Sequence, residues 1–211
     1  MKITKFGHCC LLIEEGNLRI LTDPGNYSTS QNDAKNIDVV LITHEHQDHL
    51  HLDSLKTILV NNPKAKIVTN HSVGNLLAKE GIRYVFLEDG QILEEKGISI
   101  EAFGKKHAVM HSAIPQTENT GYFIANKFFY PGDAFTNPRK PIEILALPVA
   151  GPWLRLSDGI EYAKELKPKI CFPVHDGMLK SIGSTNKLPS VVLEPLGIKF
   201  IVPELNKKTD Y

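Results

Sequence analysis

Short apolar segments separated by polar turns fill most of the chain, in the pattern typical of β-strands. Strands are predicted at Ile3–Phe6, Cys10–Glu14, Leu18–Leu21, Ile37–Ile42, Lys66–Thr69, Tyr84–Leu87, Ile98–Phe103, Tyr122–Ala125, Lys127–Tyr130, Ile144–Leu147, Ile170–Pro173 and Lys199–Val202. A helical spacing of apolar residues predicts helices at Leu52–Val60, Ser72–Lys79, Ser157–Leu166 and Ser190–Leu196. The polar segment Lys207–Tyr211 is expected to be frayed.

Antiparallel hairpins are therefore mixed with strand–helix–strand units. Two sheets packed face to face, with helices on their outer faces, would bury the apolar side of these elements. The predicted fold class is α/β (α+β), arranged as a four-layer αβ/βα sandwich. A chain of 211 residues fits one such domain, residues 1–211.

The two halves of the sequence share a weak similarity. The segment CLLIEEGNLRILTDPGNY, which contains Asp23, resembles GYFIANKFFYPGDAF, which contains Asp133. Further along, AKIVTNHSVG with His71 matches PKICFPVHDG with His175. Each half would supply one sheet, and the strand ends would meet at a shared edge. Because hairpins and buried strands resemble one another in many proteins, chance similarity is the alternative.

Composition limits the partners that the chain can have. Lys and Arg together number 24, as do Asp and Glu, so no overall positive field attracts nucleic acid. Three cysteines without disulfide spacing favour a reducing compartment, and Cys9 and Cys10 are expected to face opposite sides of a strand. The apolar run near the amino terminus is too short for a signal peptide or a membrane span. A cytoplasmic protein without a membrane partner is therefore expected.

One segment, LITHEHQDHL, gathers four side chains that bind divalent cations: His44, His46, Asp48 and His49. They follow the buried strand Ile37–Ile42, and the i, i+2 spacing of His44 and His46 points both imidazoles the same way, so one ion can take both. Asp48 and His49 come after the chain turns toward the next helix, and they suit a second ion. Two ions ~3.5–4 Å apart would lower the pKa of bound water to ~7, which is hydrolytic chemistry. The alternative is a surface cluster of histidines without a function.

The remaining ligands must come from other strand ends that reach the same edge of the sheets. Asp133 follows a hairpin and a two-residue turn, and a carboxylate there can ligate both ions. His175 ends an apolar strand and would complete the second ion's set. Either His107 or His111 would complete the first set. His107 is favoured because it lies closer to the end of a strand, and His111 would then face the substrate or support the site.

These residues together resemble those of the metallo-β-lactamase superfamily of metal-dependent hydrolases. The H-x-H-x-D-H motif is highly specific for that superfamily, and GHCCLLIE, TDP, PGDAF, LPVAGPW and PVHDG look like its compact branch, which includes the L-ascorbate-6-phosphate lactonases. The resemblance implies that Asp133 bridges two ions, the first held by His44, His46 and His107 and the second by Asp48, His49 and His175. It also implies that Asp23 holds a ligand imidazole and that His8 lies near the pocket.

Some positions depart from the patterns of these relatives. Ala108 follows His107 where small polar residues are common, so the choice between His107 and His111 stays open at this stage. His46 stands where the oxygen-reducing di-iron relatives carry glutamate, which disfavours a redox role. The long inserted domain of the RNA-cleaving relatives is absent.

The predicted function is hydrolysis of a small lactone, ester or phosphoester by a hydroxide that two divalent ions share and that Asp48 orients. His111 would donate a proton to the leaving group, or the second ion would stabilise that group directly. Zinc is the expected metal, and manganese and iron also suit these ligands. A phosphodiesterase or nuclease of the same fold and a non-catalytic metal-binding sensor are the alternatives.

Four basic residues and one tryptophan bear on the nature of the substrate. Lys105, Lys106, Arg139 and Lys140 flank ligand-bearing loops, where they either favour an anionic substrate or are simply solvated. Trp153, the only tryptophan, either caps the pocket or packs in the interior.

Overall fold

Two seven-stranded sheets form the centre of the protein, whose computed structural model describes residues 1–211. The first sheet has the order β14-β1-β2-β3-β4-β5-β6, and the second has the order β13-β12-β11-β10-β9-β8-β7. The strands of the first sheet are β1 (Lys2–Gly7), β2 (Cys10–Glu15), β3 (Leu18–Thr22), β4 (Val39–Ile42), β5 (Lys66–Thr69), β6 (Val85–Phe86) and β14 (Lys208–Asp210). The strands of the second are β7 (Ile92–Glu95), β8 (Ile98–Phe103), β9 (Gly121–Ile124), β10 (Phe128–Tyr130), β11 (Ile144–Pro148), β12 (Ile170–Val174) and β13 (Lys199–Phe200).

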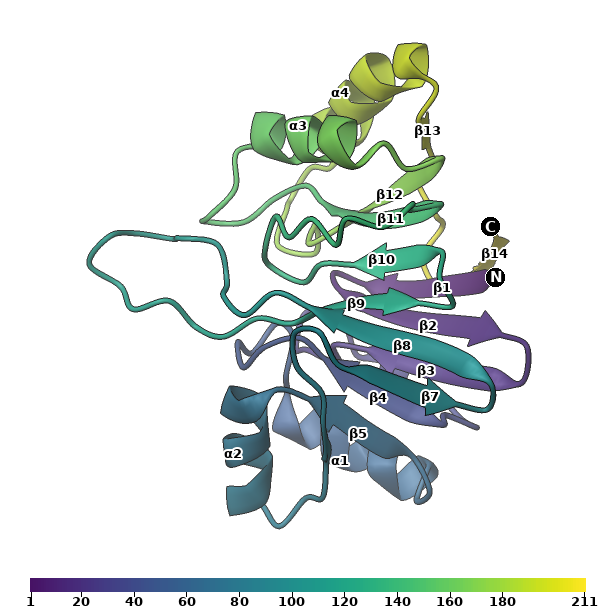
Figure 1. Cartoon of the computed structure of the whole chain (residues 1–211), viewed down its shortest axis with the longest axis vertical. Helices are drawn as coiled ribbons and strands as arrows, with labels where there is room; N and C mark the ends of the chain where they lie inside the picture. The colour runs from purple at the N-terminus through teal and green to yellow at the C-terminus, as the bar shows by residue number, and fades with distance from the viewer.

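Helices cover the outer face of each sheet, as Figure 1 shows. The helices are α1 (Leu52–Asn61), α2 (His71–Lys79), α3 (Leu156–Leu166) and α4 (Gly183–Leu193), with short 3-10 helices at Ser30–Asp33 and Glu194–Leu196. Apolar residues of α1 and α2 pack on the first sheet, and those of α3 and α4 pack on the second. The predicted four-layer αβ/βα sandwich is therefore confirmed. None of these helices has both the length and the apolar character needed to cross a bilayer.

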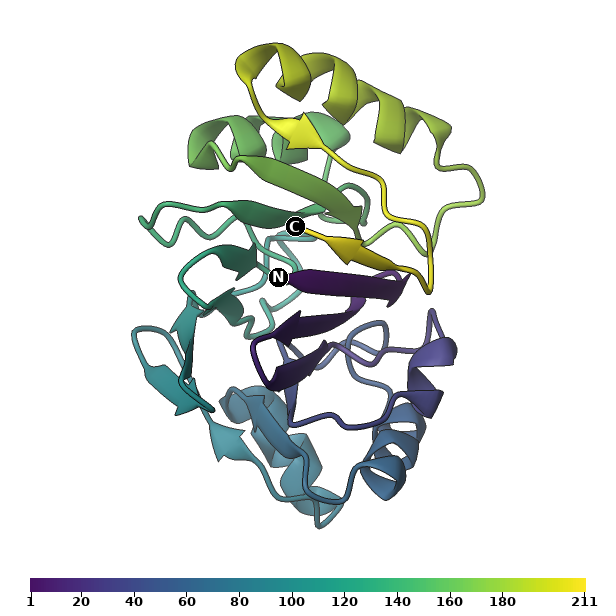
Figure 2. The same ribbon diagram turned by 90° about the vertical axis from the view of Figure 1, so that its right-hand side faces the viewer.

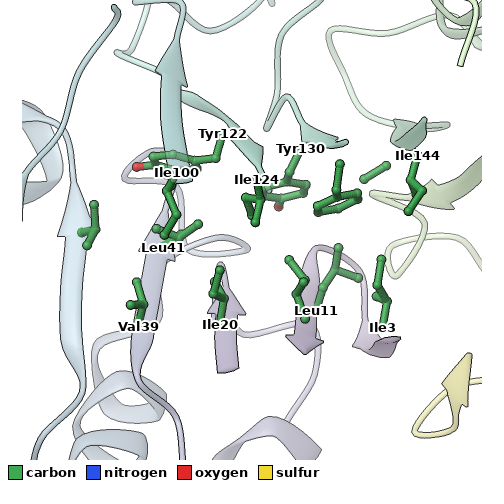
Figure 3. Close-up of a cluster of buried hydrophobic side chains, with 14 of the residues drawn as sticks. Ile3, Leu11, Ile20, Val39, Leu41, Ile100, Tyr122, Ile124, Tyr130 and Ile144 are labelled. Atoms are coloured by element: carbon green, nitrogen blue, oxygen red, sulfur yellow. The ribbon is translucent and has the colours of Figure 1, made fainter. Parts of the chain in front are cut away.

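The main core lies between the two sheets. Figure 3 shows side chains of the two sheets facing each other, among them Ile3, Leu11 and Ile20 from the first and Tyr122, Ile124 and Tyr130 from the second. Strand β4 explains why a buried strand is apolar throughout: Val39 and Leu41 join this core, whereas Val40 and Ile42 face α1 and α2.

The two sheets share one topology. In the first, β1, β2 and β3 pair antiparallel and β3 to β6 pair parallel; in the second, β7 to β10 pair antiparallel and β10 to β13 pair parallel. This shared order is what the similarity between the two halves of the sequence predicts. The carboxyl ends of parallel strands from both sheets meet at one edge of the sandwich, where loops carry the predicted ligands.

Two predictions about the elements are wrong, and one strand was missed. Lys207–Tyr211 is not frayed: Lys208–Asp210 forms the edge strand β14, paired with β1, so the two chain ends lie side by side (Figures 1 and 2). Strand β7 was not predicted, because its half-exposed sequence ILEE has little apolar character. The last helix begins at Gly183 rather than Ser190, since Pro189 lies inside it, where proline normally marks a helix start.

Candidate metal centre

The seven predicted ligands converge at this edge from four loops. Four of them lie after β4 in the first sheet, and the other three follow β8, β10 and β12 of the second sheet. Those residues are His44, His46, Asp48 and His49 after β4, His107 after β8, Asp133 after β10 and His175 after β12. The centre therefore joins the two sheets.

A first set of donors is formed by His44, His46 and His107, whose ligand atoms all lie within 4.8 Å of one another. The Nε2 atom of His44 lies 3.1 Å from Nδ1 of His46. The orientation of the His107 ring is fixed by a hydrogen bond, because its Nδ1 lies 2.6 Å from the backbone oxygen of Ala108 and donates to it. Nε2 of His107 is therefore left with a lone pair that faces the other two imidazoles.

A second set of donors is formed by Asp48, His49 and His175. Oδ2 of Asp48 lies 3.8 Å from Nε2 of His49 and 3.4 Å from Nε2 of His175. His175 has a left-handed backbone, with φ of 63°, which turns its side chain from the end of β12 toward the centre.

Asp133 lies between the two sets. Its carboxylate is 3.3 Å from Nε2 of His107 and 3.9 Å from Nε2 of His44 in the first set. It is also 3.1 Å from Nε2 of His49 and 2.8 Å from Nε2 of His175 in the second. One carboxylate thus reaches imidazoles of both sets, which is the arrangement of a bridging ligand.

Several of these buried donor atoms have no hydrogen-bond partner. They are Nε2 of His49, Nε2 of His107, Oδ1 of Asp133 and both ring nitrogens of His175. A buried polar atom without a partner is costly, so a cluster of such atoms is rare in a folded protein unless a ligand binds them. Imidazoles and carboxylates at this spacing fit divalent transition metals.

The pKa values of the cluster show how strongly its buried carboxylate interacts with the imidazoles around it. Burial alone would raise the pKa of Asp133, but His49 and His175 hold it well below its usual value. Burial opposes the charged form of His175, yet Asp133 raises its pKa to about 10. Burial lowers the pKa of His44 well below its usual value, which leaves that imidazole neutral and able to donate a lone pair.

Asp23 supports His49 from behind. Its Oδ2 lies 2.7 Å from Nδ1 of His49, and its side chain is fully buried. The hydroxyls of Thr43 and Tyr130 donate to the same carboxylate, at 2.7 and 2.5 Å. Asp23 therefore fixes the ring of His49 so that Nε2 faces the centre. Sequence reasoning identified Asp23 by resemblance and missed Thr43 and Tyr130.

His8 contacts Asp48. The backbone N–H of Gly177 donates to Nδ1 of His8, so the ring proton lies on Nε2, which is 3.1 Å from Oδ2 of Asp48. The backbone N–H of His175 also donates to the backbone oxygen of His8. Burial lowers the pKa of His8 to about 4, so the ring is neutral at pH 7. His8 thus contacts two residues of the second set.

Two residues beside these loops were not predicted to belong to the site. Sγ of Cys9 lies within 4.8 Å of ligand atoms of His8, His49 and His175. Its position next to His8 in the sequence was the signal that could have indicated this. Gly25 packs so closely on the ligand loop that a Cβ there would lie 1.8 Å from the backbone oxygen of Asp48. As predicted, Cys9 and Cys10 lie in different core clusters, on opposite sides of the first sheet.

Trp153 both packs and makes a polar contact. Its Nε1–H donates to Oδ2 of Asp133 at 2.8 Å, and its ring packs edge-on against Phe135, His107 and His175. The tryptophan therefore orients Asp133 and forms one wall of the pocket beside it.

The structure brings His107 to the centre and leaves His111 outside it. The loop between β8 and β9 projects from the molecule in Figure 1, away from the chain ends. His111 is exposed on this loop, where its Nδ1 accepts a hydrogen bond from the backbone of Ala113. None of the four basic side chains lines the pocket beside Asp133. Lys105 faces Asp89, and Lys140 pairs with Glu101.

Comparison with known proteins identifies the family of the chain. Residues 2–175 match the family described as the beta-lactamase superfamily domain. The Mycobacterium tuberculosis protein Rv0786c is 34% identical over 184 residues, which cover 85% of each chain. A UPF0173 metal-dependent hydrolase of Thermoplasma acidophilum is 27% identical, over 98% of this chain and 97% of its own.

A solved structure shares the fold. Igni18, described as a novel metallo hydrolase of the archaeon Ignicoccus hospitalis, superposes with a TM-score of 0.77 over 100% of this chain and 98% of its own, at 21% identity. The family match, the relatives and the converging histidines and aspartates lead to one conclusion. The chain belongs to the metallo-β-lactamase superfamily and is a metal-dependent hydrolase.

Proposed function

We propose that the protein holds two divalent ions, zinc in the first place, and hydrolyses a small molecule at its carbonyl or phosphorus centre. The observation that carries this proposal is the position of Asp133 between two sets of buried donors, several of which have no other partner. His44, His46 and His107 would hold one ion, and Asp48, His49 and His175 the other. Manganese and iron suit the same ligands.

Ions bound in this way lower the pKa of water and neutralise negative charge that develops on oxygen. Asp48 is the residue placed to orient the attacking water, because its side chain is 19% exposed whereas those of His49, Asp133 and His175 are 3% exposed or less. His8 donates a hydrogen bond to Asp48 and so limits the directions in which the carboxylate can point.

The other buried residues act by positioning these ligands. Asp23 accepts the Nδ1 proton of His49 and keeps Nε2 of that ring free for an ion. Trp153 donates to one oxygen of Asp133 and so fixes the plane of the proposed bridging carboxylate. Each of these contacts joins a ligand to a buried side chain.

The size of the pocket beside Asp48 supports a small substrate. Its volume is about 260 Å³, below the ~300–1,000 Å³ of typical ligand pockets. No lysine or arginine lines it, so nothing in it recognises a polynucleotide backbone. A lactone, an ester or a small phosphoester fits this space, in line with the resemblance to the compact lactonase-containing branch.

The test is turnover of a panel of substrates by protein loaded with zinc or manganese. A lactone, a 4-nitrophenyl ester and bis(4-nitrophenyl) phosphate would represent the three substrate classes. We expect hydrolysis that EDTA abolishes and that Asp48→Asn lowers at least ~100-fold without unfolding the protein. Persistent inactivity toward all three with two ions bound would instead indicate a metal-binding protein without turnover.

A further inference from the structure

The walls of the pocket differ in chemistry from its metal-binding floor. Twelve residues line it, and apart from the proposed ligands they are uncharged. Asn26 and Gln47 contribute amides on one side. Met110, Trp153 and Met178 contribute apolar surface from three different loops. The walls therefore combine apolar surface with two amides and the phenol of Tyr27.

No lysine or arginine lines this pocket to bind an anion. The one buried lysine, Lys5, is fully engaged: it donates to both carboxylate oxygens of Asp176 at 2.7 Å and to the backbone of Pro173 at 2.8 Å. Lys105 and Lys140 face Asp89 and Glu101 instead of the pocket. A phosphate or carboxylate on the substrate would find no cationic side chain on these walls, only neutral amide and phenol donors.

The carboxylates of the centre also offset much of the charge that bound ions bring. Asp48 and Asp133 would face the ions, and Asp23 lies directly behind His49. Their combined charge opposes most of the charge of two divalent cations. The centre as a whole therefore exerts only a weak attraction on a second anionic group of the substrate.

The apolar walls match a short carbon chain. Met110 comes from the loop between β8 and β9, which also exposes Val109 and Ile114. Met178 comes from the loop after β12 and is 39% exposed. Methionine side chains adapt their shape to small apolar groups, and a rigid indole opposite them provides a flat surface.

We propose that the substrate is an uncharged carboxylic ester or lactone with a small apolar acyl group, rather than an anionic compound. This inference rests on the hydrolase function proposed above. In the reaction water adds its oxygen to the acyl carbon, the acyl C–O bond breaks, and the proton of water ends on the released alcohol oxygen. No further reactant is needed.

Two esters of equal length and equal reactive group test the inference. 4-Nitrophenyl pentanoate is neutral, and mono(4-nitrophenyl) glutarate carries a carboxylate in place of the terminal methyl. With the metal-loaded protein we expect kcat/KM for the pentanoate to exceed that for the glutarate by at least ~10-fold, the effect of ~1.4 kcal/mol. An equal or higher kcat/KM for the glutarate would overturn the inference.

A pair of variants tests whether the apolar surface of Met178 causes the preference for the pentanoate over the glutarate. Met178→Lys should reduce the pentanoate-to-glutarate ratio at least fivefold, because it places a cation beside the acyl chain. Met178→Leu keeps the apolar surface and should keep the ratio. An unchanged ratio in the lysine variant would contradict the proposed wall.

Binding can be measured independently of turnover, because Trp153 is the only tryptophan and lines the pocket. Two ketones that cannot be hydrolysed, 1-phenyl-2-hexanone and the matched acid 5-oxo-6-phenylhexanoate, can be titrated into metal-loaded protein while this fluorescence is followed. We expect the Kd of the neutral ketone to be at least ~10-fold lower than that of the acid. If the metal-loaded protein had no esterase activity but still bound the neutral ketone more tightly than the acid, the hydrolytic proposal alone would be refuted. Tighter binding of the acid would refute the inference.

Discussion

At the scale of single residues, His8 connects the first turn of the chain to the proposed second ion. Its tautomer is fixed by the backbone N–H of Gly177, and its Nε2–H donates to Asp48. A carboxylate held from behind in this way loses less freedom when it binds a cation. The role of His8 is thus one of positioning, through Asp48.

Replacement of His8 tests that role. His8→Ala should lower the affinity for the second ion by ~10–100-fold and leave the affinity for the first ion unchanged. His8→Gln should recover part of the lost affinity, because an amide can also donate to Asp48. Competition with a chromogenic chelator measures both affinities without any substrate. Equal affinities in wild type and His8→Ala would contradict the positioning role.

The choice between His107 and His111 leads to a second prediction. His107 is buried with Nε2 facing Asp133, whereas His111 is exposed on the projecting loop. Native mass spectrometry of zinc-loaded protein should show that His107→Ala loses an ion and that His111→Ala keeps the same number as wild type. The reverse result would transfer the ligand role to His111.

Residues of the centre could be predicted where a short sequence or a strand end carried the signal. His44, His46, Asp48 and His49 lie within six positions, and Asp133 and His175 follow apolar strands. Thr43 and Tyr130 could not be found in this way. Their contacts, such as the hydrogen bond from Tyr130 to Asp23, join segments 107 residues apart and exist only in the folded chain.

At the scale of elements, strands with a buried face on both sides were predictable, and the polar edge strands β7 and β14 were not. Strand β4 is apolar on both faces because core and helices enclose it. Strand β14 has the sequence KTD, and its pairing with β1, the ion pair of Lys208 with Glu14 and the packing of Tyr211 on Phe172 hold it in place. Tertiary contacts thus decide its structure against a polar sequence.

An ion pair at the end of β2 connects the two sheets and makes stability depend on pH. Glu15 contacts Lys127, in the turn between β9 and β10, at 2.5 Å, and the amino terminus at 3.3 Å. Burial alone would raise the pKa of Glu15, but the two cations lower it below its usual value. Since the folded-state pKa is depressed, the stabilisation is present above the unfolded-state pKa and is lost as pH falls through the folded-state pKa.

Glu15→Gln should therefore lower the free energy of unfolding at pH 7 by no more than ~1 kcal/mol, because the pair is partly solvated. The difference from wild type should disappear once pH falls below the lowered pKa of Glu15. Urea unfolding of both proteins from pH 7 down to acidic pH measures it. A difference that stays constant over this range would show that the amide acts through packing instead of charge.

At the scale of the whole molecule, the proposed centre joins the two sheets. Its ligands follow β4 in the first sheet and β8, β10 and β12 in the second. Bound ions would therefore stabilise the packing of one sheet on the other, and the buried donors would lose their partners without them.

Removal of metal should consequently lower the melting temperature. Each ion at ~100 times its Kd contributes ~2.7 kcal/mol, which corresponds to a fall on the order of 5–10 °C for a domain of this size. Calorimetry before and after dialysis against EDTA, followed by addition of zinc, measures the effect, with His111→Ala as a matched control that should respond like wild type. A melting temperature that is insensitive to EDTA would argue against tightly bound ions.

The central claim is a pair of ions bridged by Asp133, and anomalous scattering at the zinc edge from crystals of the zinc-loaded protein tests it most directly. The account predicts two peaks, one surrounded by His44, His46 and His107 and one by Asp48, His49 and His175, with the carboxylate of Asp133 in contact with both. A single peak, or two peaks that Asp133 does not join, would contradict it.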